Sequence, residues 1–210
     1  MSIKAVLFDF GGVILTSPFD AFERYEERQG LPAGFIRSLN ATNHTTNAWA
    51  QLESSSVSID EFCSLFEAEA EAAGADGRLV AADVLACLSG EVRPHMVEAV
   101  RRCHSRPGLT TAMLTNNFVA DEGARDLSSV FAHFDYIIES SKVGVRKPDV
   151  RFYEIALREI GVSASEAVFL DDLGINLKPA RALGMTTIKV DDPDVALDEL
   201  EAVVGFPLRS

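Results

Sequence analysis

Polar side chains stand directly after short apolar runs at four points of the chain. Carboxylates follow the first and fourth runs, a hydroxyl and two amides follow the second, and a lysine closes the loop after the third. In chain order they are Asp9, then Thr115, Asn116 and Asn117, then Lys147, then Asp171 and Asp172. Carboxylates that meet at one point repel each other unless a cation joins them, and such oxygen ligands suit Mg²⁺ together with a substrate phosphate. A carboxylate that reaches the phosphorus can also act as a nucleophile, while the lysine and threonine hold phosphoryl oxygens.

The elements that must position these residues alternate between strand and helix. Five short apolar runs have the composition of strands buried on both faces of a parallel sheet. The expected strands are Ile3–Phe8, Thr110–Leu114, Tyr136–Ile138, Ala167–Leu170 and Thr186–Val190. The expected helices between and after them are Pro94–His104, Val150–Ile160, Asn176–Leu183 and Ala196–Val204. This alternation predicts an α/β fold, in which ligands bind outside the carboxyl ends of the strands, where the polar residues stand.

One long stretch, from about residue 18 to about residue 93, contains no convincing strand. Its helical patterns cover Phe19–Gln29, Pro32–Leu39, Ala48–Glu53, Ile59–Ala73 and Gly77–Leu88. Ser58 or Asp60 could cap the fourth of these helices, and Gly74 could end it. We therefore expect a discontinuous core, residues 1–17 and 94–210, with a helical domain, residues 18–93, inserted after the first strand.

Composition limits the class of function. The 210 residues have an ordinary share of apolar side chains, 47%, and carry a net charge of −13, which argues against nucleic acid or an anionic membrane as partner. No run approaches the ~20 apolar residues that span a bilayer. The three cysteines, Cys63, Cys87 and Cys103, have neither disulfide nor zinc spacing, so we expect a cytoplasmic protein. The expected ligand is a small-molecule phosphate, and the oligomeric state is left open.

The polar residues also resemble the four motifs of the haloacid dehalogenase (HAD) superfamily, in the same order. They stand in LFDFGGV, AMLTNN, VRKPD and VFLDDLGIN. The likeness covers the whole chain, and the helical insert resembles the C1-type cap of that family. The segments TAMLTNN, ESSKVGVRKPD and FLDDLGINLKPARALGMTTIKV are similar in particular to the amino-terminal phosphatase domain of soluble epoxide hydrolase and the related domain of acyl-CoA dehydrogenase family member ten. The resemblance implies a Rossmann-like core with an all-helical C1 cap. It also implies Mg²⁺-dependent hydrolysis of a small organic phosphate through an aspartyl phosphate.

The resemblance further implies a role for each site residue. Asp9 would be the nucleophile and a Mg²⁺ ligand, the main-chain carbonyl of Gly11 a second ligand, and Asp172 the direct carboxylate ligand of the fourth motif. The remaining residues would act on water and on phosphate. Asp171 and Asn176 would orient metal-bound waters, and Thr115, Asn116 and Lys147 would bind the phosphoryl group.

Gly11 departs from the pattern of the family. Most of its phosphatases carry a second aspartate two residues after the nucleophile as general acid and base, a group that typically contributes about 10²–10⁴-fold in rate. Three interpretations follow: a substrate with a good leaving group, a stand-in such as His44, Asp20 or water, or a module that binds without turnover. Dehalogenases of the family also lack this aspartate, but they typically place a tyrosine where Gly11 stands and work without metal.

Simpler interpretations of the same residues exist. Thr115 and Asn116 could cap a following helix, and Asp171 with Asp172 could cap the helix that starts near Asn176. Two adjacent carboxylates at a strand end are nevertheless costly without a partner, which favours the functional interpretation.

Overall fold

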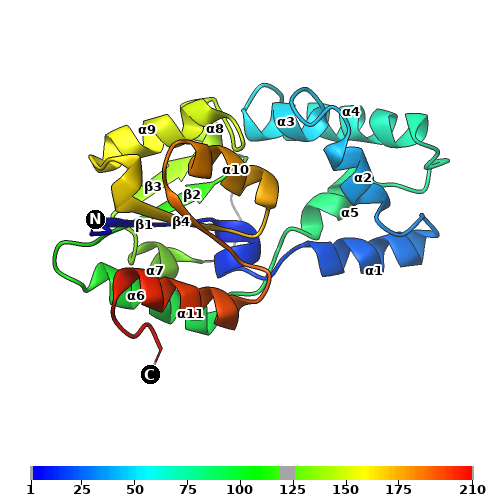
Figure 1. Ribbon diagram of the computed structural model, residues 1–210. Coiled ribbons are helices and arrows are strands. Elements are labelled where there is room, and N and C mark those ends of the chain that lie inside the picture. The colour runs from blue at the N-terminus through cyan, green and yellow to red at the C-terminus, as the bar shows by residue number, and fades with distance from the viewer. Residues whose placement is uncertain (1, 119–125, 210) are drawn as a thin grey trace.

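The sheet expected from the sequence lies at the centre of the molecule. The computed structural model describes residues 2–118 and 126–209, so residues 1, 119–125 and 210 of the predicted core lie outside it. Its described part contains a five-stranded parallel sheet in the order β3-β2-β1-β4-β5 (Figure 1). The strands are β1 (Ala5–Phe8), β2 (Thr110–Thr115), β3 (Tyr136–Glu139), β4 (Ala167–Asp171) and β5 (Thr186–Lys189). The α/β, Rossmann-like class predicted from the sequence is confirmed.

Both faces of the central strand β1 are buried, which explains its nearly continuous apolar sequence. Val6 and Phe8 belong to the apolar cluster on one face, while Ala5 and Leu7 belong to the cluster on the other. Helices cover both faces of the sheet (Figure 1), as a wholly parallel sheet requires. They are α6 (Pro94–His104) and α11 (Pro193–Val204) on the first face, and α9 (Val150–Ile160) and α10 (Gly174–Ala182) on the second.

The bounds of these helices mostly match the prediction, and the differences come from capping. α6 and α9 have the predicted bounds, whereas α11 begins at Pro193, three residues before the predicted Ala196. The Asp192 carboxylate accepts hydrogen bonds from the backbone of Asp194 and Val195, so the helix starts earlier than its apolar pattern. Besides the turn after β1, three short pieces of the described chain were not predicted: α7 (Ser128–Phe131), α8 (Ser140–Val143) and a 3₁₀ turn, Ala164–Glu166.

The insert between β1 and α6 folds around its own apolar cluster, centred on Trp49, Phe62 and Phe66. Its helices are α1 (Phe19–Gln29), α2 (Phe35–Ala41), α3 (Ala48–Glu53), α4 (Ile59–Ala72) and α5 (Ala81–Ala86). Ser58 caps α4 through a reciprocal pair of hydrogen bonds with Glu61, as the sequence suggested. Two predicted helices start too early, at Pro32 and Gly77. The reason is a left-handed glycine in each case, Gly34 (φ +75°) and Gly77 (φ +72°), which a continuous helix does not accommodate.

The insert leaves and rejoins the core at a single place beside the carboxyl end of β1. The chain turns after β1 through Phe10–Ile14, a wide turn closed by a hydrogen bond from Leu15 N to Phe10 O at 2.9 Å. Leu15 then pairs with Val92 of the returning segment in an isolated antiparallel bridge. Figure 1 shows the insert helices on one side of the sheet, away from the amino terminus. None of the described helices combines the length and apolarity needed to span a membrane.

Candidate active site at the carboxyl edge of the sheet

The register of the parallel strands brings the first and fourth motifs together. Phe8 of β1 is level with Leu170 of β4, so the next residues, Asp9 and Asp171, stand side by side. The backbone N–H of Asp9 donates to Leu170 O at 2.8 Å and extends the ladder by one residue. Thr115 ends β2 on the other side of β1. Polar residues far apart in the sequence therefore meet because each follows the end of a neighbouring strand.

Lys147 lies at the centre of this group, with only 1% of its side chain exposed. Its ammonium contacts Asp9 Oδ1 at 2.8 Å and donates to Asp171 Oδ2 at 2.7 Å. Asp9 Oδ1 also accepts the backbone N–H of Phe10 at 2.6 Å, whereas Asp9 Oδ2 accepts no hydrogen bond within the described residues. One oxygen of Asp9 is thus held in place, and the other is free to act on a ligand.

Asp171 is enclosed on all sides. It is fully buried, and its Oδ1 accepts the backbone N–H of Leu173, the residue just before α10, at 2.8 Å. The amide of Asn176 donates to both of its oxygens at 3.0 and 3.1 Å, and Lys147 takes the remaining contact. With every acceptor direction used by protein, Asp171 and Asn176 fix the lysine and the helix start rather than face open solvent. The helix-capping interpretation is not confirmed for Asp171, because no side chain of the described residues caps α10, and its functional role stays a prediction.

Asp172 points the other way, against the turn after β1. A Cβ placed on Gly12 would lie 2.2 Å from Asp172 Oδ2, so this carboxylate sits where any other side chain at position 12 would be. Gly12 also has a φ of +74°, which favours glycine. Gly11 differs on both counts, because its φ is −67° and an added Cβ would meet nothing within 4 Å.

The three carboxylates form a group that fits a divalent cation. One oxygen each of Asp9, Asp171 and Asp172 lie within 4.8 Å of one another, and three carboxylates against one ammonium leave a formal charge of −3 + 1 = −2. Burial raises the pKa of Asp9 well above its usual range, and Lys147 offsets only part of this effect. Burial and the neighbouring Asp171 raise the pKa of Asp172 to about 6. A hard divalent ion would offset this charge, and the three carboxylates gathered here could hold one.

Asn116 holds the backbone of Lys147 on both sides of the lysine. Its Oδ1 accepts the Lys147 N–H at 2.8 Å, and its Nδ2 donates to the Lys147 carbonyl at 3.0 Å. The same Nδ2 donates to Glu53 at 3.2 Å, so both amide hydrogens are engaged and the side chain serves to place Lys147. The Thr115 hydroxyl, which is buried, makes a long bond of 3.3 Å to the Asn116 carbonyl.

Two residues at the site were not found by sequence reasoning. Glu53 ends α3 in the insert and reaches Asn116, as described above. Arg93, the last residue of the insert, donates to the carbonyl of Gly12, and its charge acts to lower the pKa of Asp172. Neither stands after a strand or in a recognisable motif, so only the tertiary fold reveals them. Burial lowers the pKa of Arg93, and among the predicted stand-in groups Asp20 lies near enough for its charge to oppose this effect. The backbone carbonyl of His44 accepts a hydrogen bond from Arg146 at 2.7 Å.

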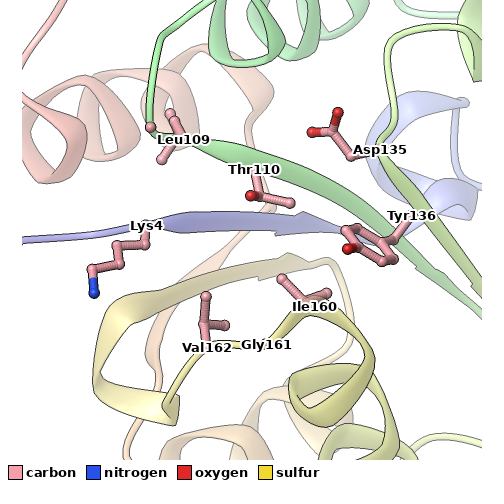
Figure 2. Close-up of a pocket in the computed structure, with 9 residues that line it drawn as sticks. Lys4, Leu109, Thr110, Asp135, Tyr136, Ile160, Gly161 and Val162 are labelled. Carbon is pink, nitrogen blue, oxygen red and sulfur yellow. The ribbon is translucent and has the colours of Figure 1, made fainter.

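The site is distinct from a hollow of about 540 Å³ at the opposite edge of the sheet. Figure 2 shows this hollow between Lys4, Thr110, Tyr136 and Val162. Lys4 precedes β1, while Thr110 and Tyr136 open β2 and β3, so the hollow lies at the amino ends of the strands. It therefore contains none of the motif residues.

Comparison with known proteins agrees with this geometry. The sequence model of one protein family, the haloacid dehalogenase-like hydrolases, matches residues 3–184 of this chain. Acyl-CoA dehydrogenase family member 10 of Mus musculus is 35% identical over 99% of this chain, and bifunctional epoxide hydrolase 2 of Sus scrofa is 31% identical over 99%. The chain spans only 20% and 40% of those proteins. Phosphatase MT3486 of Mycobacterium tuberculosis is 33% identical, over 91% of this chain and 88% of its own length.

Solved structures share the fold. A predicted HAD-like family hydrolase from Porphyromonas gingivalis superimposes with a TM-score of 0.66 at 19% identity, over 97% of this chain and 98% of that one. A HAD family enzyme from Bacteroides thetaiotaomicron, solved with magnesium and inorganic phosphate, gives 0.60 at 16% identity, over 90% and 94%. Motif order, strand register and the family match agree, and the chain belongs to the haloacid dehalogenase-like hydrolases.

Proposed function

We propose that the protein is a Mg²⁺-dependent phosphatase that hydrolyses a small organic phosphate through an aspartyl phosphate on Asp9. The observation that carries the proposal is the arrangement around Lys147, which fixes Asp9 Oδ1 at 2.8 Å and leaves Oδ2 unoccupied among the described residues. The relatives named as phosphatases, including sesquiterpene phosphatase astK of Aspergillus oryzae, support the reaction class. The carboxylate group favours a cation-dependent reaction over dehalogenation.

The side chains divide the chemistry between them. Asp9 Oδ2 attacks the phosphorus while the bond from phosphorus to the leaving oxygen breaks, and a water then hydrolyses the acyl phosphate to release inorganic phosphate. Lys147 and the Thr115 hydroxyl hold the phosphoryl oxygens as charge develops. Bound by Asp9, Asp172 and the Gly11 carbonyl, Mg²⁺ would neutralise phosphate charge. Asp171 and Asn176 keep Lys147 in position, since their polar atoms face each other and the lysine.

The helical insert, residues 18–93, would serve as the cap that covers this edge. Its α3 contacts the core through Glu53, and its two connections to the core lie beside Asp9. A cap in this place can exclude bulk water and select the organic part of the substrate.

Gly11 determines which substrates react well. It cannot donate a proton to the leaving oxygen, so the leaving group must depart as an anion or take a proton from water. Acyl and anomeric phosphates, whose leaving groups are stable anions, should therefore react faster than alkyl monoesters. The substrates of the longer relatives are one source of candidates for the organic part.

Phosphate release from a panel of esters, acyl phosphates and sugar 1-phosphates, with and without Mg²⁺, tests the proposal. Asp9→Asn should lower the rate by at least about 10³-fold, because the amide is a poor nucleophile. Asp60→Asn, an exposed substitution in the first turn of α4, serves as the control and should leave the rate unchanged. Activity that survives Asp9→Asn refutes the aspartyl phosphate.

A module that binds phosphate and metal without turnover is the second candidate, and Gly11 is the observation in its favour. The position can accept an aspartate, because its backbone is unstrained and an added Cβ meets nothing within 4 Å. If the natural protein binds phosphate but releases none from any ester, and Gly11→Asp creates release, the chain had lost only its acid step. Turnover by the natural protein rules out the silent module.

A further inference from the structure

The carboxylate of Glu53, in the insert, contacts two loops of the candidate site in the core. Glu53, at the end of α3, lies 2.6 Å from Arg146 Nε through its Oε2 and accepts the Asn116 amide at 3.2 Å on the same oxygen. The N–H of Arg146 Nε is not aimed at that oxygen, so the contact with Arg146 is an ion pair. Glu53 Oε2 therefore contacts both Arg146, just before Lys147, and Asn116, just after β2.

Both partners of Glu53 lead to Lys147. Arg146 is its neighbour in the chain, and Asn116 holds its backbone N–H and carbonyl. Arg146 Nη1 also donates to the His44 carbonyl at 2.7 Å, so the guanidinium is held by the insert at two points. Lys147 must keep its ammonium within contact of Asp9 and Asp171, and a shift of about 1 Å at a reacting group can cost about 10²-fold in rate.

The charge on Glu53 does not by itself add to the stability of the folded state. Burial raises the pKa of Glu53 despite Arg146, so the folded state favours the protonated acid more than the unfolded state does. An acid with a raised folded pKa destabilises the protein above that pKa and gains stability as the pH falls through it. At neutral pH the charge on Glu53 therefore carries a burial cost, which its ion pair with Arg146 offsets only in part, and this calls for another reason for the charge.

We propose that Glu53 is a positioning residue of the phosphate site, acting through Arg146 and Asn116 to hold Lys147 in place. The site is then complete only when the insert lies against the core. The kinetic consequence rests on the proposed phosphatase function, while the structural consequence does not.

Glu53→Ala should lower kcat by about 10-fold or more on a small ester such as para-nitrophenyl phosphate and leave KM within about twofold. Glu53→Gln keeps an acceptor for Asn116 and loses the ion pair, so it should retain more of kcat. Arg146→Met should match Glu53→Ala, and the double variant should be no worse than either, because all three break one network.

Ser55→Gly is the matched control. Ser55 follows α3 and donates to the Ser141 carbonyl at 3.1 Å, so it also joins insert to core, but it touches none of the site residues. Its φ is +55°, which glycine accommodates without strain. The control should keep kcat within about twofold of the natural protein, as expected for a surface change.

Hydrogen exchange separates the failure of this proposal from the failure of the proposed function. The Lys147 N–H, bonded to Asn116, should exchange faster in Glu53→Ala and at the natural rate in Ser55→Gly. This comparison decides the proposal even if the natural protein shows no turnover. Unchanged exchange in Glu53→Ala overturns it, as does an unchanged kcat in an active protein, or an equal loss of kcat in Ser55→Gly.

Discussion

The two adjacent glycines after Asp9 should respond oppositely to the same substitution. Alanine at position 12 would place its Cβ 2.2 Å from Asp172 Oδ2, and moving that oxygen to an ordinary contact of 3.4 Å requires 3.4 − 2.2 = 1.2 Å of retreat. Alanine at position 11 meets nothing within 4 Å, and its φ of −67° suits any residue. Gly11→Ala is therefore a control one residue away, with the same change of chemistry.

The expected magnitudes follow from the backbone and from Asp172. A non-glycine residue at the φ of +74° of Gly12 costs roughly 1–2 kcal/mol, before any cost of moving the carboxylate. Gly11→Ala should instead stabilise by about 0.4–1 kcal/mol, because alanine restricts the unfolded chain. The two variants should differ by about 2 kcal/mol in the free energy of unfolding, with Gly12→Ala the less stable.

Urea unfolding at pH 7.5 measures this difference, and calorimetric titration with Mg²⁺ measures the effect on the carboxylates. Displacing Asp172 by about 1 Å should weaken Mg²⁺ binding by at least about tenfold, as expected when a ligand loses its placement. Gly11→Ala keeps the carbonyl at position 11 and should bind Mg²⁺ as the natural protein does. If Gly12→Ala is as stable as Gly11→Ala and binds Mg²⁺ equally, the close packing of Asp172 on Gly12 does not hold and the assignment of Asp172 as a metal ligand fails.

Two further predictions concern buried titratable groups. Lys147→Met removes the ammonium between Asp9 and Asp171 and should cost about 3–5 kcal/mol in unfolding free energy at pH 7.5 without metal. This loss of unfolding free energy should be smaller at pH 5.5, because burial raises the folded-state pKa values of Asp9 and Asp172, and their protonation then favours the folded state. A loss under about 1 kcal/mol at pH 7.5 contradicts the ion-pair argument. Burial raises the pKa of Cys103 to about 12, so about 10⁻⁴ of this thiol is ionised at pH 8. A disulfide reagent should titrate it only after unfolding, and rapid reaction in the native protein would show that the thiol is not enclosed.

Much of the fold could be predicted because its signals are local. β1 reads as a buried parallel strand since Ala5, Val6, Leu7 and Phe8 fill both faces of the sheet, and α6 and α9 have periodic apolar faces with clear ends. The three cysteines are free in this structure. The turn after β1 could not be predicted, because its conformation depends on Asp172, more than 150 residues further along the chain.

In the candidate site, too, some residues could be predicted from the sequence and others could not. Residues that directly follow strands were found, since strand order alone brings them to one edge. The hydrogen-bond partners of Asp171 and Asn116 could not be predicted from the sequence, because they depend on which groups meet in the folded state. Glu53 could not be predicted as part of the site for the same reason. Its contact with Asn116 crosses from the insert to the core, and no periodicity or motif records such a pair.

Position 11 shows why the departure from the family pattern is chemical rather than structural. A glycine required by the fold has a left-handed φ or a crowded Cβ position, and its neighbour Gly12 has both. Gly11 has neither, so the fold would accept the aspartate that most phosphatases of the family carry. The backbone there contributes its carbonyl, which any residue supplies equally well. What the glycine withholds is a proton donor and a third negative side chain beside Asp9 and Asp172, whose pKa values are already raised by burial. Under the proposed function, the missing acid therefore bears on the leaving group, and the carboxylates that could hold a cation do not depend on it.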